Sequence, residues 1–130
     1  MITDEQLQIS VVLSGKEFFP SRVNGVFEVA LSSCQEPGSQ GRSGRKIEFG
    51  SAVVDLPAGL ALESSDTLSF FAKIQDGILK TSSRAESMEI TVHVTARYED
   101  QCNLEFPLPF LKAVSGLGAN LTLTCTPIPR

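Results

Sequence analysis

The chain has 130 residues, a formal net charge of −4, and 42% hydrophobic against 20% charged residues. This length and composition predict one domain over residues 1–130 and exclude a chain that is disordered throughout. The acidic balance argues against nucleic acid as a partner, and no apolar run approaches the ~20 residues that cross a bilayer, so we also expect no membrane partner.

The cysteines bear on the cellular compartment. The first eight residues carry two acidic side chains and no apolar run, which differs from a secretory signal. Cys34, Cys102 and Cys125 lie far apart in the sequence. An odd number of cysteines without a signal predicts reduced thiols and a cytoplasmic location. We expect Cys102 and Cys125 to be buried on inward strand faces and Cys34 to be exposed.

The first half of the chain predicts strands around one short helix. Alternating apolar residues indicate a strand over residues 7–13 that ends at a glycine. Residues 18–25 carry a proline suited to a first helical turn and an Asn-Gly pair suited to a helix end, so we predict a short helix there. Further strands are predicted over residues 26–31 and 47–56, on either side of a glycine-rich loop at 36–44.

Residues 66–80 fit two structures. Phe71, Ile74 and Ile78 recur at helical spacing, whereas local alternation and the Asp76-Gly77 pair would fit a hairpin. The length of the segment favours the helix, with its lysines mainly on the outer side.

The second half contains the clearest alternation, over residues 88–98, which predicts a strand with His93 on its polar face. Residues 102–106 are predicted to form a hairpin with it, followed by a helix over 109–117 and a strand over 121–125. The elements together predict an α+β fold: a largely antiparallel sheet of five to six strands with two to three helices packed on one face.

Several segments resemble a known family. They are Arg97–Phe106, Leu111–Val114, Leu117–Leu121, the opening Leu13–Pro20 and the glycine-rich Glu36–Arg42. Together they are similar to a family of small bacterial proteins catalogued as domain of unknown function 4279. The resemblance covers about two-thirds of the chain, and it implies a bacterial cytosolic α+β protein. It implies no activity, and the chain departs from the family pattern after Pro20, where a fuller helix is expected.

His93 is the single histidine of the chain. A zinc site would need His93 together with all three cysteines, and no C-x-x-C spacing supports such a site, so we expect no metal. His93 is predicted to be a surface residue on a polar strand face. The alternative is a general base or a pH-sensitive group in a groove.

The glycine-rich loop is the best candidate for a ligand site in the sequence. Its glycines expose backbone N–H groups, and Arg42, Arg45 and Lys46 could hold an anion, with His93 as a further contact. The loop lacks the Gly-Lys-Ser/Thr that opens a helix in a phosphate-binding loop, so no cofactor is predicted. The alternative is a solvated mobile loop.

Two functions remain open. The first is a non-catalytic domain that binds another protein, such as a toxin-neutralising immunity protein, because the sequence shows no set of nucleophile, base and acid. The second is a small-molecule or anion-binding protein, or a weak enzyme, that uses the loop from Arg42 to Lys46. A homodimer joined by sheet edges is a further possibility.

Overall fold

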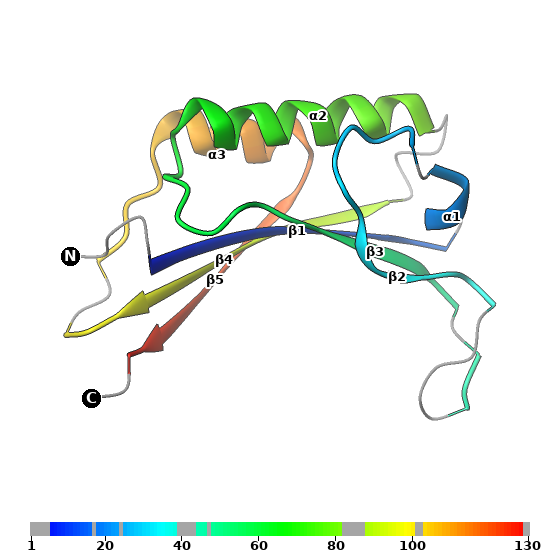
Figure 1. Ribbon diagram of the computed structural model, residues 1–130, viewed down its shortest axis with the longest axis horizontal. Coiled ribbons are helices and arrows are strands. Elements are labelled where there is room, and N and C mark those ends of the chain that lie inside the picture. The colour runs from blue at the N-terminus through cyan, green and yellow to red at the C-terminus, as the bar shows by residue number, and fades with distance from the viewer. Residues whose placement is uncertain are drawn as a thin grey trace.

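The computed structural model describes residues 6–16, 18–23, 25–38, 44–46, 48–81, 88–100 and 103–128. Figure 1 shows a sheet with two long helices above one of its faces. The elements are β1 (Leu7–Gly15), α1 (Pro20–Val23), β2 (Ser32–Gln35), β3 (Gly50–Asp55), α2 (Ser65–Thr81), β4 (Glu89–Tyr98), α3 (Leu108–Gly116) and β5 (Asn120–Pro127).

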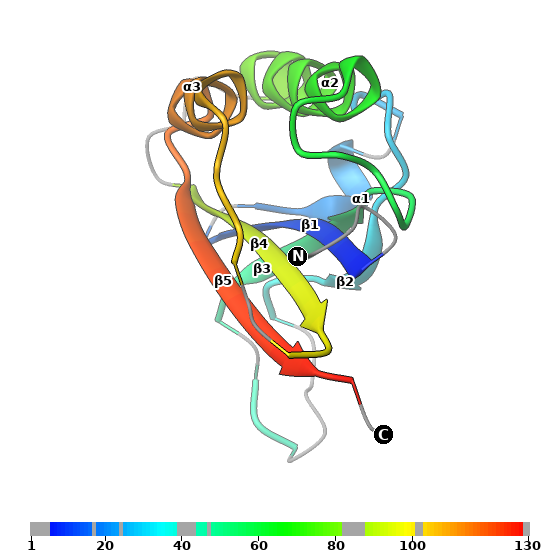
Figure 2. The same cartoon turned by 90° about the vertical axis from the view of Figure 1, so that its left-hand side faces the viewer.

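The sheet has five strands in the order β2-β3-β1-β4-β5. The pairs β2–β3, β3–β1 and β1–β4 are antiparallel, and β4–β5 is parallel. α2 and α3 lie over the same face of the sheet, with α3 on the β5 side (Figure 2). The predicted α+β class, with a largely antiparallel sheet and its helices on one face, is confirmed.

The core lies between the two long helices and the sheet. β1 alternates strictly between buried and half-buried side chains along all nine residues. Its inward residues meet those of β3 and β4, and the helices cover them with Phe71, Ile74 and Phe110, each at most 2% exposed. Phe71 and Phe110 place their ring centroids 5.5 Å apart, which joins α2 to α3 over the sheet.

α2 confirms the helical prediction for residues 66–80. The Ser64 hydroxyl accepts a hydrogen bond of 3.1 Å from the backbone N–H of Thr67, the geometry of an N-cap. The fully buried Thr67 hydroxyl donates to the Ala61 carbonyl at 2.6 Å, which ties the cap to the preceding turn. Near the other end, exposed Lys80 pairs with Asp76 at 2.9 Å, and the hydrogen bond and charge of Asp76 raise the pKa of Lys80.

Two strand predictions are wrong. Residues 26–31 are not a strand; β2 follows them at Ser32–Gln35. Phe27 is 5% exposed and packs against α2, so this irregular segment contributes a side chain to the core. Asn103–Phe106 does not pair with β4 either, because β1 and β5 already occupy both sides of that strand. Instead, Phe106 stacks on Phe110 of α3 with centroids 5.8 Å apart.

Neither of the long helices can span a membrane: among the described residues, no helix is long and apolar enough.

Gly77 of α2 provides a test of this packing. A Cβ placed on Gly77 would lie 2.3 Å from the Phe27 ring, whereas on Gly116 of α3 it would lie 3.9 Å from the nearest atom, in Gln75. Alanine in a helix is normally favoured over glycine by about 1 kcal/mol. We expect Gly77→Ala to lower the free energy of unfolding by about 1–3 kcal/mol, because the buried ring must move.

Gly116→Ala is the matched control and should be neutral or stabilising by up to about 1 kcal/mol. Urea denaturation of both variants measures the difference. Equal stabilisation by the two substitutions would contradict the close packing of Phe27 on α2.

Candidate functional site

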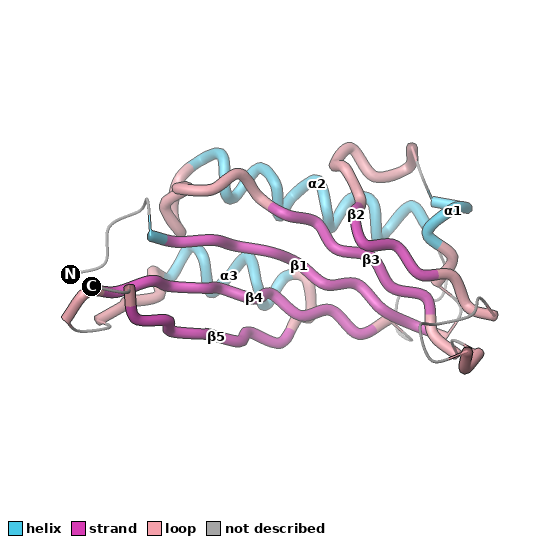
Figure 3. The backbone as a smooth tube through the Cα atoms, turned by 60° about the horizontal axis from the view of Figure 1, so that its bottom comes forward, coloured by secondary structure: helices cyan, strands magenta, loops and turns pink. Residues whose placement is uncertain are grey.

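Among the described residues, no helix lies over the face of the sheet away from α2 and α3 (Figures 2 and 3). We call this face the open face. The strand register places short polar and β-branched side chains side by side on it. They are Ser51 and Val53 of β3, Ser10, Val12 and Ser14 of β1, Thr91, His93 and Thr95 of β4, and Thr122 and Thr124 of β5.

His93 lies on this face, half-buried, on the polar side of β4 as predicted. Its two ring nitrogens contact two hydroxyls of the neighbouring strand: Nδ1 contacts Thr122 Oγ1, and Nε2 lies 3.1 Å from Thr124 Oγ1. A hydroxyl can donate or accept, so the two threonines suit either tautomer of the neutral ring. The imidazole therefore bridges β4 to the edge strand β5.

The row through His93 contains the residue types of a catalytic triad. Asp55, Ser10 and His93 lie opposite one another on β3, β1 and β4. A triad needs the histidine to bond both the nucleophile and the orienting acid. Here both ring nitrogens contact the β5 threonines, and Asp55 Oδ2 accepts from Ser32 Oγ at 3.4 Å. These three side chains therefore share a row on the surface but do not have the hydrogen bonds of a triad.

The predicted loop site lies elsewhere. Arg42 lies outside the described residues, while Arg45 and Lys46 are exposed in the connection from β2 to β3. Gly50, which opens β3, lies opposite Gly15, and His93 lies opposite Ser10. These positions are five residues apart along β1, or about 17 Å. The loop that carries Arg45 and Lys46 therefore joins the sheet at a point away from His93. That this loop binds an anion remains a prediction.

The cysteine predictions have different outcomes. Cys34 in β2 is exposed, as predicted. The predicted burial of Cys125 is wrong: its register partner Ala96 is fully buried, but Cys125 is exposed because β5 is an edge strand that the helices do not fully cover. Cys102 lies outside the described residues. Within the described part of the chain, no three His, Cys, Asp or Glu side chains gather into a possible metal site.

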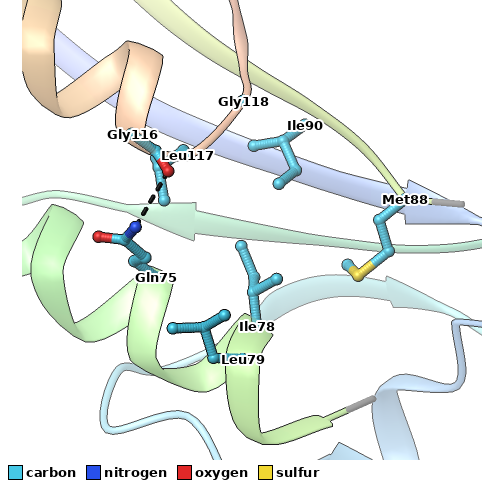
Figure 4. A pocket seen from close by; sticks show the side chains of 8 residues that line it. All are labelled: Gln75, Ile78, Leu79, Met88, Ile90, Gly116, Leu117 and Gly118. Carbon is cyan, nitrogen blue, oxygen red and sulfur yellow. Dashed lines mark hydrogen bonds between the residues drawn. The ribbon is translucent and has the colours of Figure 1, made fainter. Parts of the chain in front are cut away.

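A feature that the sequence analysis missed is a cavity of about 330 Å³ between α2, α3 and the start of β4 (Figure 4). Its lining surface is divided almost evenly between polar and apolar atoms, and the Gln75 amide in it donates to the Gly116 carbonyl at 3.0 Å. The lining residues are Gln75, Ile78, Leu79, Met88, Ile90, Gly116, Leu117 and Gly118. No local pattern could reveal this space, because three separate elements form it.

Comparison with the models of known protein families, with curated proteins and with solved structures found no match for the chain. The resemblance to domain of unknown function 4279 therefore remains an expectation from the residues quoted above. The site has to be interpreted from its own geometry.

The bridge between His93 and Thr124 can be measured by a double-mutant cycle. We expect His93→Ala and Thr124→Ala to show a coupling of about 0.5–1 kcal/mol in the free energy of unfolding, because each substitution removes the same side-chain hydrogen bond. The control cycle pairs His93→Ala with Thr126→Ala. Thr126 lies opposite Arg97, so its coupling to His93 should be near zero. Equal coupling in the two cycles would contradict the bridge.

Proposed function

We propose that the chain is a non-catalytic protein-binding domain and that its partner docks on the open face. The observation that carries the proposal is the composition of this face. Its centre consists of uncharged hydroxyl and valine side chains around His93, on a rigid sheet whose opposite face forms the core. Such a face offers hydrogen-bonding groups at little cost in side-chain entropy.

The distribution of charge on the open face supports a protein as the ligand. Asp55, Glu89 and Arg97 lie on this face at or next to the ends of their strands, and all three are exposed around the uncharged centre. Protein interfaces have the same organisation, with charged residues depleted at the centre and polar residues at the rim. A small-molecule site would instead be expected to be concave.

The narrower form of the proposal is a bacterial, cytoplasmic immunity protein that neutralises a toxin. The support for it is the net charge of −4, which favours a basic partner, together with the odd number of cysteines. The contacts of His93 support a non-catalytic role. Both ring nitrogens contact β5 threonines, so neither is positioned to take a proton from the Ser10 hydroxyl.

The test is a long side chain placed at the centre of the open face. We expect Ser10→Arg to weaken binding of a partner isolated with the wild-type chain by at least about tenfold, because the long side chain would hold the partner away from the sheet. Asp55 lies opposite Ser10, so the expected effect is steric and is not that of an unpaired charge. Ser69→Arg on the exposed surface of α2 makes the same substitution in the helix layer and should leave the affinity unchanged. Titration calorimetry with the purified partner measures both, and equal effects of the two variants would refute docking on the open face.

The cavity beneath α2 and α3 favours a second candidate function, the binding of a small molecule that carries both apolar and polar groups. Its volume of about 330 Å³ is at the lower end of the range of ligand pockets. Ile78, Ile90 and Leu117 provide buried apolar surface, and the Gln75 amide provides a polar group at the wall (Figure 4). This mixed lining suits a small aromatic or aliphatic compound that carries one hydrogen-bonding group.

Indole and short aliphatic alcohols are suitable probes for the cavity. A compound at ten times its Kd should raise Tm by about 3–6 °C. Met88→Trp should abolish the shift, because the larger side chain would fill the cavity. Phe49→Trp, an exposed position outside the lining, is the control and should keep it. If no probe raises Tm, or if Met88→Trp leaves the shift intact, the cavity is not a ligand site for this class.

A further inference from the structure

β5 is an edge strand with features that favour pairing with another strand. It runs for eight residues, Asn120–Pro127, with no charged side chain, and among the described residues only β4 pairs with it. Proteins usually protect such an edge with charges, bulges, prolines or a short strand. Here the single proline, Pro127, lies at the very end of the strand, so seven consecutive residues retain their N–H groups.

The opposite edge of the sheet is protected. β2 has four residues, its pairing with β3 is irregular between Ser32 and Gln35, and Ser33 has a positive φ of 49°. These features twist and shorten the edge, which limits strand addition. The β2 edge of the sheet is thus protected against strand addition, and the β5 edge, which we call the open edge, is not.

An exposed apolar strip accompanies the open edge. Leu123 of β5 is 41% exposed on the helix-facing side, although Val94, its register partner on β4, is fully buried. α3 lies above β5 (Figure 2), and its Leu111 is 40% exposed. Leu111 and Gly116 point about 140° apart around the helix, and Gly116 faces Gln75 of α2, so Leu111 lies on the flank away from α2.

We propose that β5 is the contact surface for a second copy of this chain, which pairs antiparallel along it about a two-fold axis at Leu123. A second copy fits because the edge is self-complementary: it has no charge to repel itself, and a two-fold axis makes the strands antiparallel. This inference is independent of the proposed function.

The register follows from the proline. The hydrogen-bonding stretch is Asn120–Thr126, and its middle residue is Leu123. Centred there, all seven residues pair: Leu123 meets its own copy, Leu121 meets Cys125, and Thr122 meets Thr124. Side chains opposite each other keep to the same face, so the leucines join on the helix side and the threonines on the open face. The product is a continuous ten-stranded sheet with α2 and α3 of both copies on one side.

Sedimentation over a range of protein concentrations, in reducing buffer, tests the proposal. We expect the wild-type chain to reach twice its 14.0 kDa mass at high concentration. Leu123→Lys should raise the dimer Kd at least about tenfold, because the axis would place two ammonium groups directly opposite each other. Leu79→Lys, at a 71% exposed leucine of α2, is the matched control and should leave the dimer Kd unchanged.

Cross-linking tests the register. Under mild oxidation, Leu123→Cys should yield a disulfide-linked dimer rapidly, since the two thiols face each other across the axis. Leu79→Cys is the control and should cross-link no faster than the wild-type chain. A chain that stays monomeric at millimolar concentration, or a dimer that Leu123→Lys does not weaken, overturns the proposal. A dimer weakened by Leu123→Lys in which Leu123→Cys cross-links no faster than Leu79→Cys overturns the register.

Discussion

The antiparallel pairing of β1 with β4 is the constraint on which the rest of the structure depends. Eight residues of β1 pair directly with β4, and every second one points into the core. Val11 and Val92 face each other at 0% exposure, while the next pair, Ser10 and His93, lies on the open face. A slip of one residue would exchange the two sets and bury the histidine among aliphatic side chains. The register therefore determines both the core and the candidate site.

Local periodicity was sufficient where a segment is long and one of its faces is buried. Residues 88–98 and 7–13 alternate over many residues, so β4 and β1 were predicted from sequence, and so was the side of the strand that holds His93. Residues 26–31 also alternate, but over a short stretch. Phe27 in that stretch is buried by a contact with Gly77, fifty residues away in the sequence, and no local pattern contains that information.

Strand neighbours were harder to predict than strands. The turn residues after residue 98 indicate a hairpin, because sequential strands often pair. In the structure, α3 instead connects β4 to β5, and β5 pairs with β4 in parallel. This crossover accounts for two errors. It leaves Asn103–Phe106 as a connection that leads into α3, and it places Cys125 in an edge strand. The contacts of His93 with Thr122 and Thr124 depend on the same parallel register, so the sequence could not predict them either.

The helix layer lies on one side of the sheet, so it separates the residues of the core from those of the proposed binding surface. The buried residues of β1, β3 and β4 face α2 and α3, so substitutions on the open face remove little apolar burial. That face can therefore change its chemistry while the core stays constant, as expected of a surface that matches a partner. Pairing through β5 would extend this argument, because the two-fold axis keeps both helix layers on one side. The two open faces would then join into a single surface, with His93 of each copy one strand away from the central β5 pair.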